Sequence, residues 1–316
     1  MNPVPVAMRI GIDFGGTKIE GVVMDTRSRL VARERVATPR GDYEATLQAI
    51  TGVVQCLETA AGCQNLPVGV GHPGAISPST GLLKNSNSTC LNGRPFKQDL
   101  EAVLGRGVYL ANDADCLAVS EARDGAAAGA ANVFAVILGT GVGGGIAIGG
   151  RLIRGPNAIT GEWGHNPLPW IRPEWDELPG AACWCGHHGC IETWLSGVGL
   201  ARDHEHLTSE RLSGEAIVQR AEASEERAAA TLSRYEDRLA RALAHVINLL
   251  DPEVIVLGGG VSRIERLYCT VPRLWAQWVF SDRVDTKLVP ALHGDSSGVR
   301  GAAFLCPERR PQQRGC

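Results

Sequence analysis

Three cysteines lie close together in the glycine-rich segment CWCGHHGC: Cys183, Cys185 and Cys190. The first residues of the chain do not read as a secretory signal, so we expect the thiols to stay reduced and such a tight cluster to bind metal. Three thiolates and one imidazole suit a tetrahedral, structural zinc site. The residues alone leave the imidazole open among His165, His187 and His188. Three free buried thiols are the alternative, which this close spacing disfavours.

A carboxylate stands where a buried strand gives way to a helix, in the segment GVYLANDADC. The helix is expected to open around Asp113, next to Asn112. The plainest interpretation is a helix cap. The helix dipole and nearby N–H groups also hold such a carboxylate ionised, which is the protonation state that a general base requires. Asp113 is therefore a candidate for both roles.

Three glycine clusters follow apolar strands, in DFGGTK, GTGVGGG and VIVLGGG. Backbone amides without a neighbouring Cβ can approach a phosphate closely. GTGVGG satisfies the dinucleotide fingerprint, but that motif requires a following helix, and IAIGGRLI is strand-like. DFGGTK departs from the P-loop pattern because Lys18 follows Thr17 instead of preceding a serine or threonine. We expect two hairpin turns that face one another across a phosphate.

The elements that position these residues occur in two similar sets. Residues 8–24 are typical of strand, glycine turn and strand, and the same pattern recurs from Asn132 onward. Asp42 should cap a helix that runs to about Ala61 and ends at Gly62. The pattern therefore predicts an architecture that is duplicated within the chain.

The second half of the chain is expected to be mainly helical around one further buried strand. Residues 214–250 have helical spacing, and Asp251 and Pro252 should end that helix. Beyond the strand VIVLGGG, a helix should hold Trp275 and Trp278 in the core, and residues 295–306 should form a closing helix.

Composition is typical of a globular protein, with 44% hydrophobic and 21% charged residues, and it favours neither disorder nor a membrane span. A net charge of −3 gives no broad electropositive surface for a nucleic-acid backbone. We expect a cytoplasmic protein without nucleic-acid or membrane partners.

Motifs in order along the chain resemble those of the actin-like sugar kinases. IGIDFGGTKIE is similar to their first phosphate motif, GTGVGGG to the second, and VIVLGGG to the adenosine motif. EWGH followed by CWCGHHGCIE resembles the signature of the ROK family (repressors, open reading frames, kinases). The resemblance extends from about Met8 to Cys306.

This resemblance implies an α/β protein with the two-domain actin-like (ribonuclease H-like) ATPase fold, an interdomain cleft and a zinc-bearing loop. We expect an N-terminal α/β domain at 1–120 and a larger C-terminal α/β domain at 121–316, with the zinc loop at 157–197. The last helix, about 296–306, is expected to be able to pack back on the N-terminal domain. The insert between His165 and Cys183, with Trp170 and Trp175, should cover the cleft or form a subunit contact.

The resemblance also assigns site residues. Asp113 becomes the general base, Asp13 lies near Mg²⁺, and His165 is the fourth zinc ligand beside the three cysteines. Lone glutamates are usually solvated, but the family pattern places two of them on the sugar. The expected sugar-binding residues are Asn87, Asn112, Glu162, His165 and Glu192. The expected ATP-binding residues are Gly11, Asp13, Gly15, Gly16, Thr17, Lys18, Gly139, Thr140, Gly141, Val142, Gly143, Gly144, Gly145, Gly258, Gly259 and Gly260. Cys90 stands where an aromatic residue is common.

Within the family the resemblance is closest to bacterial fructokinases that also accept mannose, through TPRGDYEATLQAI, NSTCLNGRPF, GEWGHNPLPW and HGDSSGVRGAA. It implies an ATP:hexose 6-phosphotransferase that uses ATP, Mg²⁺ and structural Zn²⁺ and makes fructose 6-phosphate, with mannose or glucose as further hexoses. A homodimer is expected.

Three alternatives stay open at this point. An N-acetylglucosamine kinase or glucokinase would use the same catalytic parts. A sugar-sensing regulator of the family carries an N-terminal helix-turn-helix, whereas seven residues precede Met8 here. A zinc-loop protein that only binds sugar or a partner would not need Asp113 as a base.

Overall fold

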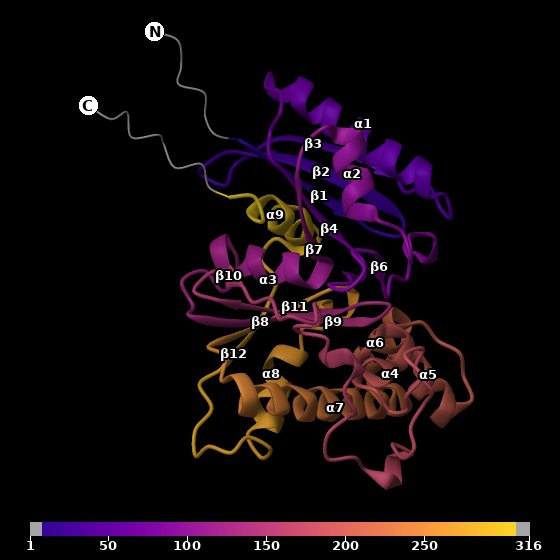
Figure 1. The fold of residues 1–316 in the computed structure, drawn as a ribbon. Coiled ribbons are helices and arrows are strands. Elements are labelled where there is room, and N and C mark those ends of the chain that lie inside the picture. Colours follow the sequence, from indigo (N-terminus) through magenta and orange to yellow (C-terminus); the bar gives the residue numbers. More distant parts are fainter. Residues whose placement is uncertain (1–7, 308–316) are drawn as a thin grey trace. The chain divides into compact units, whose positions relative to one another are not determined.

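The computed structural model describes residues 8–307, which divide into two compact units. Unit 1 contains the residues up to Ser120, the segment Arg154–Ile159 and the residues from Ser296 onward. Unit 2 contains Glu121–Ile153 and Thr160–Asp295. Each unit is built on a five-stranded mixed sheet (Figure 1).

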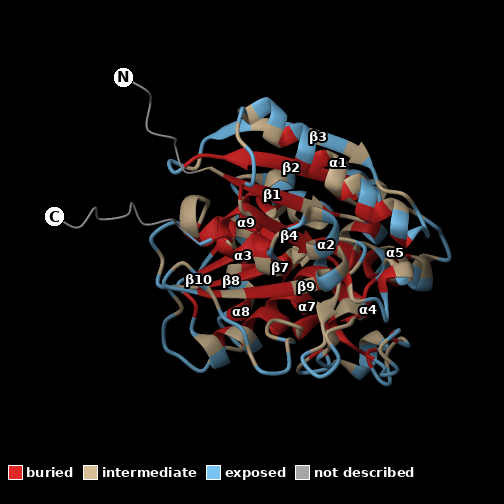
Figure 2. Ribbon diagram, turned by 45° about the horizontal axis from the view of Figure 1, so that its top comes forward, coloured by how far each residue is buried: buried red, intermediate tan, exposed pale blue. Residues whose placement is uncertain are grey.

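The sheet of unit 1 has the strand order β3-β2-β1-β4-β7. Its strands are β1 (Arg9–Phe14), β2 (Lys18–Met24), β3 (Leu30–Ala37), β4 (Val68–His72) and β7 (Val108–Asn112). The predicted hairpin is confirmed, since β1 pairs antiparallel with β2, while β4 runs parallel to β1 and β7 parallel to β4. The central strands are buried, whereas the edge strand β3 alternates toward solvent (Figure 2). The sequence analysis did not indicate β3, whose segment LVARERVA has three charged residues in a row at its centre.

Helices cover both faces of this sheet. They are α1 (Tyr43–Ala61), α2 (Phe96–Leu104), α3 (Asp113–Asp124) and α9 (Ser297–Phe304). The predicted limits of α1 are confirmed: the Asp42 side chain accepts a hydrogen bond from the Ala45 N–H, and Gly62 ends the helix with φ 63°. Short elements complete unit 1: β5 (Ala75–Ile76), β6 (Leu83–Lys84) and the 3-10 turn η1 (Thr89–Leu91).

Helix α9 approaches the sheet so closely that two strand positions have no room for a side chain. A Cβ on Gly11 would lie 2.1 Å from the Val299 carbonyl oxygen, and a Cβ on Gly69 would lie 1.9 Å from that of Ala302. The opposite face, at Gly21, packs against Val53 and other residues of α1. The last helix of the chain is thus part of unit 1. Gly11, which the sequence analysis assigned to ATP, has a packing contact here.

The sheet of unit 2 has the order β10-β9-β8-β11-β12. Its strands are β8 (Asn132–Leu138), β9 (Val142–Ile148), β10 (Arg151–Leu152), β11 (Val254–Gly258) and β12 (Lys287–Pro290). Strands β8 and β9 form an antiparallel hairpin around a glycine turn, and β11 runs parallel to β8. The predicted recurrence of strand, glycine turn and strand is therefore confirmed within this unit.

The helices of unit 2 differ from two expectations. They are α4 (Ile191–Leu195), α5 (Gly197–Thr208), α6 (Gly214–Glu222), α7 (Glu226–Leu250) and α8 (Leu267–Trp275), with 3-10 turns at η2 (Trp163–His165), η3 (Pro173–Trp175), η4 (Gly260–Arg263) and η5 (Gly294–Ser296). The stretch 214–250 is two helices, because Ser224 takes a left-handed conformation with φ 65°. Trp278 lies beyond the end of α8 and stacks on Trp170 with ring centroids 5.2 Å apart, whereas Trp275 is in the core.

A buried network of charges joins the insert to α7. Glu177 is buried and accepts hydrogen bonds from Arg238 and Arg241, at 2.8 Å and 2.7 Å for its Oε1. Arg172 of the insert pairs with Asp237, which also contacts Arg241. Buried charges require such partners. The insert is therefore held on α7 within unit 2. None of the described helices is both long and apolar enough to cross a membrane.

Candidate functional site

In unit 1 the carboxyl ends of three adjacent parallel strands bring the predicted acidic residues to one edge of the sheet. Asp13 of β1 pairs with Gly71 of β4, and His72 of β4 pairs with Asn112 of β7. Asp13 and Asn112 are thus two strands apart, about 10 Å at the usual strand spacing. Ligands of open α/β sheets bind at this kind of edge.

Asp113 begins α3, as predicted, and its Oδ1 accepts a hydrogen bond from the Ala114 N–H at 2.8 Å. The Asn112 side chain is fixed at both ends: Oδ1 accepts from the same N–H at 2.9 Å, and Nδ2 donates to the Gly74 carbonyl at 3.0 Å. Both residues are half-buried. The start of α3 therefore has both a side chain that caps it, Asn112, and a carboxylate held in a fixed orientation, Asp113.

Negative charge gathers beneath this edge around Cys116. Burial raises the pKa of the Cys116 thiol well above its usual value, and the nearby Asp13, Asp115 and Asp113 raise it further. The Asp13 carboxylate also faces the N-terminus of α9, since a Cβ on Gly298 would lie 2.8 Å from Asp13 Oδ2. A helix N-terminus favours an ionised carboxylate. Asp13, Asp113 and Asp115 thus all lie near enough to Cys116 to act on its thiol.

A buried histidine that the sequence analysis did not single out lies between these strands. His72 is 2% exposed, packs edge-on against Phe96, and has Nδ1 3.1 Å from the Pro73 carbonyl oxygen. Burial lowers its pKa to about 4. The imidazole is therefore neutral near neutral pH and gives Asn112 an uncharged neighbour in the sheet. The buried strand VGVGHPG was the only sequence signal for it.

The first glycine turn is solvent-accessible and lies next to the loop of Asn87. Gly16 and Thr17 are exposed, and the Gly15 N–H donates to the Lys18 carbonyl at 3.0 Å. An ideal Cβ on Gly16 would lie 4.0 Å from Ser88 Oγ. The structure thus brings the turn and the exposed Asn87 into one region of unit 1.

Lys18 has a contact that the sequence analysis did not foresee. Its Nζ lies 3.2 Å from Glu20 Oε2, and Arg33 and Arg35 also pair with this carboxylate. Burial raises the pKa of Glu20, but the hydrogen bonds from Arg35 and Lys18 outweigh it and the pKa is lowered. The ammonium is therefore paired within the sheet. Cys90 is half-buried and packs on the core of unit 1, where the sequence analysis noted the lack of an aromatic residue.

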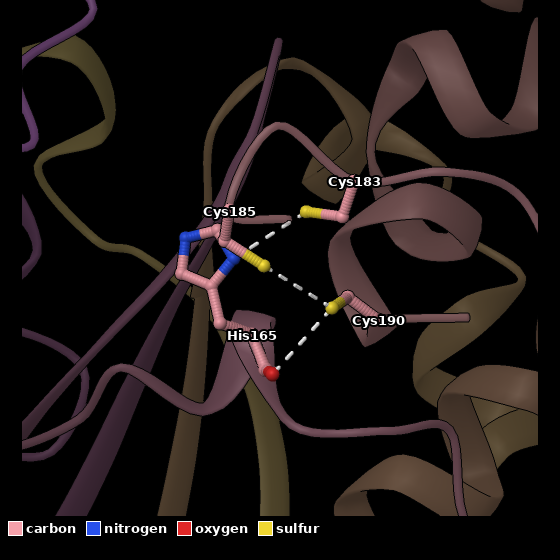
Figure 3. Close-up of side chains that lie close together, drawn as sticks. All are labelled: His165, Cys183, Cys185 and Cys190. Atoms are coloured by element: carbon pink, nitrogen blue, oxygen red, sulfur yellow. Dashed lines mark hydrogen bonds between the residues drawn. The ribbon is translucent and has the colours of Figure 1, made fainter. Parts of the chain in front are cut away.

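In unit 2 the four predicted metal ligands come together. The ligand atoms of His165, Cys183, Cys185 and Cys190 all lie within 4.8 Å of one another. His165 Nδ1 is 3.6 Å from Cys183 Sγ, and Cys185 Sγ is 3.6 Å from Cys190 Sγ (Figure 3). Ligands at the edges of a tetrahedral zinc site are separated by about 3.8 Å for a Zn–S distance near 2.3 Å. The donor set and its spacing therefore fit Zn²⁺.

The local fold decides which histidine joins the cysteines. The turn η2 carries His165, and Pro167 forms a β-bridge with Cys190. His187 and His188 are exposed on the loop, whose backbone is closed by a hydrogen bond from the Cys183 N–H to the His187 carbonyl at 2.8 Å. Their side chains lie outside the cluster, as the resemblance implied.

Glu192 links the cysteine loop to the second glycine turn. Its Oε2 accepts a hydrogen bond from the Val142 N–H at 2.9 Å, and its Oε1 accepts one from Trp184 Nε1 at 2.7 Å. The carboxylate also lies against Gly141, where an added Cβ would be 2.6 Å from Oε2. Glu162, the other predicted glutamate, is half-buried at the start of η2. Both glutamates thus flank the cysteine and histidine cluster.

The glycines of the second turn do not share one environment. Gly144 and Gly145 are buried within β9, and a Cβ on Gly144 would lie 2.7 Å from the Gly161 carbonyl oxygen. Gly143 accepts a hydrogen bond from Trp163 Nε1 through its carbonyl at 3.2 Å. These contacts are internal to unit 2 and differ from the phosphate contact expected for the whole GTGVGGG segment. Thr140 is exposed at its start.

A cavity of about 560 Å³ opens beside Thr140. It joins the second glycine turn to the end of β11 and to the N-terminal ends of α5 and α6. Its lining residues are Gly139, Thr140, Gly197, Val198, Leu200, Gly214, Glu215, Val218, Gln219, Gly260, Val261, Arg263 and Ile264. Gly258 and Gly259 lead into it from β11, and Gly259 adopts φ 85° against the Leu138 carbonyl. Its apolar walls and few polar groups are typical of a small-molecule site.

The sequence-based list of site residues did not include the residues of α5 and α6 that line this cavity. Glu215, Val218 and Gln219 lie on one side of α6, where the sequence shows only helical periodicity. These residues reach the cavity only because of the way α5 and α6 pack after the cysteine loop. That packing has no signal in the spacing of the residues.

Comparison with known proteins places these features in a family. The profile described as the ROK family matches residues 9–309. The chain belongs to the ROK family.

Curated relatives of this ROK protein include two proteins named N-acetyl-D-glucosamine kinase. The one from Photobacterium profundum is 41% identical over 301 residues, which cover 94% of this chain and 99% of the relative. The one from Vibrio cholerae is 38% identical over 301 residues, with the same coverage.

Solved structures share the fold. The ROK hexokinase from Thermus thermophilus has a TM-score of 0.84 and 29% identity, covering 95% of this chain and 97% of that one. A ROK-family glucokinase from Streptomyces griseus, solved with glucose and AMPPNP, has a TM-score of 0.76 and 29% identity over 95% and 99%. The predicted actin-like (ribonuclease H-like) α/β fold is thus shown, and this ROK protein is a sugar kinase.

The expectation of a fructokinase is not supported. The relatives are named for N-acetyl-D-glucosamine, which the sequence analysis held as an alternative. The segments quoted for fructokinase are the start of α1, the loop of Asn87, the residues around His165, and the stretch from η5 into α9. Similarity over such segments does not fix the sugar, because one altered hydroxyl contact redirects specificity.

Proposed function

We propose that this ROK protein transfers the terminal phosphate of ATP to the 6-hydroxyl of N-acetyl-D-glucosamine. The observation that carries the proposal is the oriented carboxylate of Asp113 at the sheet edge shared with Asp13. The choice of sugar rests on relatives of 37–41% identity that carry this name.

Unit 1 would supply the base and part of the sugar site. Asp113 accepts the proton of the 6-hydroxyl as its oxygen attacks the terminal phosphorus, and the bond from that phosphorus to ADP breaks. Asn112 and the exposed Asn87 bind sugar hydroxyls. Most of the rate enhancement in phosphoryl transfer comes from positioning and charge neutralisation. The fixed Asn112 side chain supports this role because it is oriented before the sugar binds.

The phosphates would be bound by the glycine turns. Gly15, Gly16 and Thr17 are accessible in unit 1, and Thr140 and Gly141 start the turn in unit 2. Mg²⁺ near Asp13 would neutralise charge on the phosphates. Oxygen ligands suit a hard cation such as Mg²⁺, and a helix N-terminus such as that of α9 favours the ionised form of a carboxylate beside it.

The cavity of unit 2 is proposed to take the nucleoside part of ATP. Its volume of about 560 Å³ is within the range of small-molecule sites. Its position between Thr140 and Gly260 joins two of the predicted nucleotide motifs. This supports ATP as the phosphate donor.

The cluster of three cysteines and His165 would hold Zn²⁺ in a structural role. Four protein donors leave no coordination position for a substrate. The ion would stabilise the loop that presents Glu162, His165 and Glu192 to the sugar. The predicted homodimer and cytoplasmic location stay predictions.

A panel of sugars tests the proposal. Purified protein is assayed for ADP release with N-acetylglucosamine, N-acetylmannosamine, glucose, mannose and fructose at equal concentrations. We expect the highest kcat/KM with N-acetylglucosamine. A higher kcat/KM with glucose or fructose would reject the sugar assignment, and no ADP release with any of the sugars would reject the kinase assignment.

A further inference from the structure

Trp184 stands between two cysteines of the metal cluster, yet its side chain is not buried with them. The residue is 65% exposed. Its Nε1 donates to Glu192 Oε1 at 2.7 Å, and its ring lies edge-on to His165 with centroids 4.9 Å apart and planes at 90°. An indole that only filled the loop would be turned inward. This one exposes a large apolar surface beside a carboxylate.

The carboxylate that Trp184 contacts is held on both sides. Trp184 binds Oε1 and the Val142 N–H binds Oε2, so rotation of the Glu192 carboxylate is restricted. Each carboxylate oxygen can accept more than one hydrogen bond. Glu192 can therefore accept further bonds from hydroxyl groups without losing either support. A group fixed in this way is preorganised for a ligand.

A hexose has the two surfaces that this pair would meet. Its ring carbons present C–H groups as an apolar face, and its hydroxyls form a polar rim. Tryptophan combines a large apolar ring with one polar N–H, and it loses little conformational entropy when it binds. With the N–H already used on Glu192, the exposed ring is left for apolar contact.

We propose that Trp184 is a sugar-contacting and positioning residue, whose N–H orients Glu192 and whose ring lies against the apolar face of the hexose. The inference rests on the proposed function, since it takes the sugar to be bound near Glu192. It gives a role to a residue to which neither the sequence analysis nor the proposed function assigns one.

Two substitutions separate the two contributions. Trp184→Phe keeps an aromatic ring and removes the N–H, and Trp184→Leu removes both. The matched control is Trp170→Phe, because Trp170 is also an exposed tryptophan of unit 2, at 43%, but stacks on Trp278 instead of the cysteine loop. Zinc content and thermal stability are measured for each full-length protein.

The readouts are the Kd for N-acetylglucosamine by calorimetry and the KM and kcat of the coupled assay. Losing one charge-assisted hydrogen bond should raise Kd and KM about tenfold in Trp184→Phe, and Trp184→Leu should raise them further. We expect kcat to change less than KM, as for uniform binding. Trp170→Phe should behave as the wild type.

Wild-type Kd in both Trp184 variants would overturn the proposal. The proposal would also be overturned if Kd rises only in variants that have lost zinc or have a lower Tm. Trp184 would then only stabilise the fold of the loop. A wild-type protein that binds N-acetylglucosamine without releasing ADP would reject the proposed kinase activity, while the Kd ratios would still decide the role of Trp184. Wild-type protein that binds none of the sugars would overturn both.

Discussion

The Oε2 atom of Glu192 accepts a hydrogen bond from the backbone N–H of Val142 at 2.9 Å. One residue follows the cysteine cluster, and the other lies in the second glycine turn. The proposed sugar-binding loop and the proposed phosphate-binding turn are thus in direct contact inside unit 2. A shift of Glu192 should therefore affect the binding of both the sugar and ATP.

Gly141→Ala tests this contact. The new Cβ would lie 2.6 Å from Glu192 Oε2, so the carboxylate must move away. We expect kcat/KM to fall on the order of tenfold to hundredfold for both the sugar and ATP, because small displacements in a catalytic site are costly. The measurement is initial rates with each substrate varied in turn.

Gly52→Ala is the control for a glycine substitution as such, since it lies within α1 and nothing would lie within 4 Å of its Cβ. Its kinetics should match the wild type. If Gly141→Ala also leaves both KM values unchanged, the link through Glu192 has no role in binding.

Asp113→Asn separates a general base from a helix cap. Asparagine caps a helix about as well as aspartate, so stability should change little. Asparagine cannot accept the hydroxyl proton, and we expect kcat to fall by about 10²- to 10⁴-fold with the Kd for sugar nearly unchanged. Turnover is measured by ADP release and binding by calorimetry.

Asp42→Asn is the matched control, because the Asp42 carboxylate also accepts a hydrogen bond from a backbone N–H at the start of a helix, that of Ala45 in α1. It should retain full activity. An Asp113→Asn enzyme with wild-type kcat would leave Asp113 as a cap alone.

Cys185→Ser should remove the metal and weaken the fold. A serine hydroxyl is a poor substitute for a thiolate on zinc, and metal binding is coupled to folding. We expect the zinc content to drop and the free energy of unfolding to fall by about 4 kcal/mol or more, as with other losses of a metal. The checks are elemental analysis and denaturant unfolding.

Cys269→Ser provides the comparison, since Cys269 is an exposed free cysteine outside the cluster. It should keep zinc and stability. The free energy of unfolding is compared between the zinc-bound wild type, the wild type without zinc, and Cys185→Ser. Equal values for all three would exclude a structural role for the ion.

His72 should make stability depend on pH. Burial lowers its pKa in the folded chain to about 4, whereas an unfolded histidine titrates near 6.5. Between these values the unfolded chain binds the proton and the folded chain does not, so stability falls as pH falls from about 6.5 to about 4. The full contribution is up to about 3 kcal/mol, from 1.36 kcal/mol per pH unit.

Urea unfolding at a series of pH values measures this slope. The His72→Phe protein keeps a ring at the contact with Phe96 and has no group to protonate. Its slope between pH 4 and 6.5 should be smaller than that of the wild type. An equal slope would place the pH dependence on other groups.

Predictions that depend on residues close together in the sequence are confirmed by the structure. Asp42 and Gly62 set the ends of α1 because each acts on the backbone within a few residues. Asp113 opens α3 for the same reason. The longest misread segment was 214–250, where helical periodicity continued through the break at Ser224. Strand β3 was missed because charged residues interrupt its apolar pattern, and its pairing with β2 makes it a strand.

The sequence by itself determined the family-defining parts: the hairpins with their glycine turns, the three cysteines, and a carboxylate at the start of a helix. These depend on residue type and near neighbours. Only the tertiary structure decided that His165 and not His187 or His188 meets the cysteines, that Glu192 bonds Val142 and Trp184, and that Gly11 packs under α9. These contacts join residues far apart in the chain, and their geometry is fixed by how sheets and helices pack, which no local spacing records.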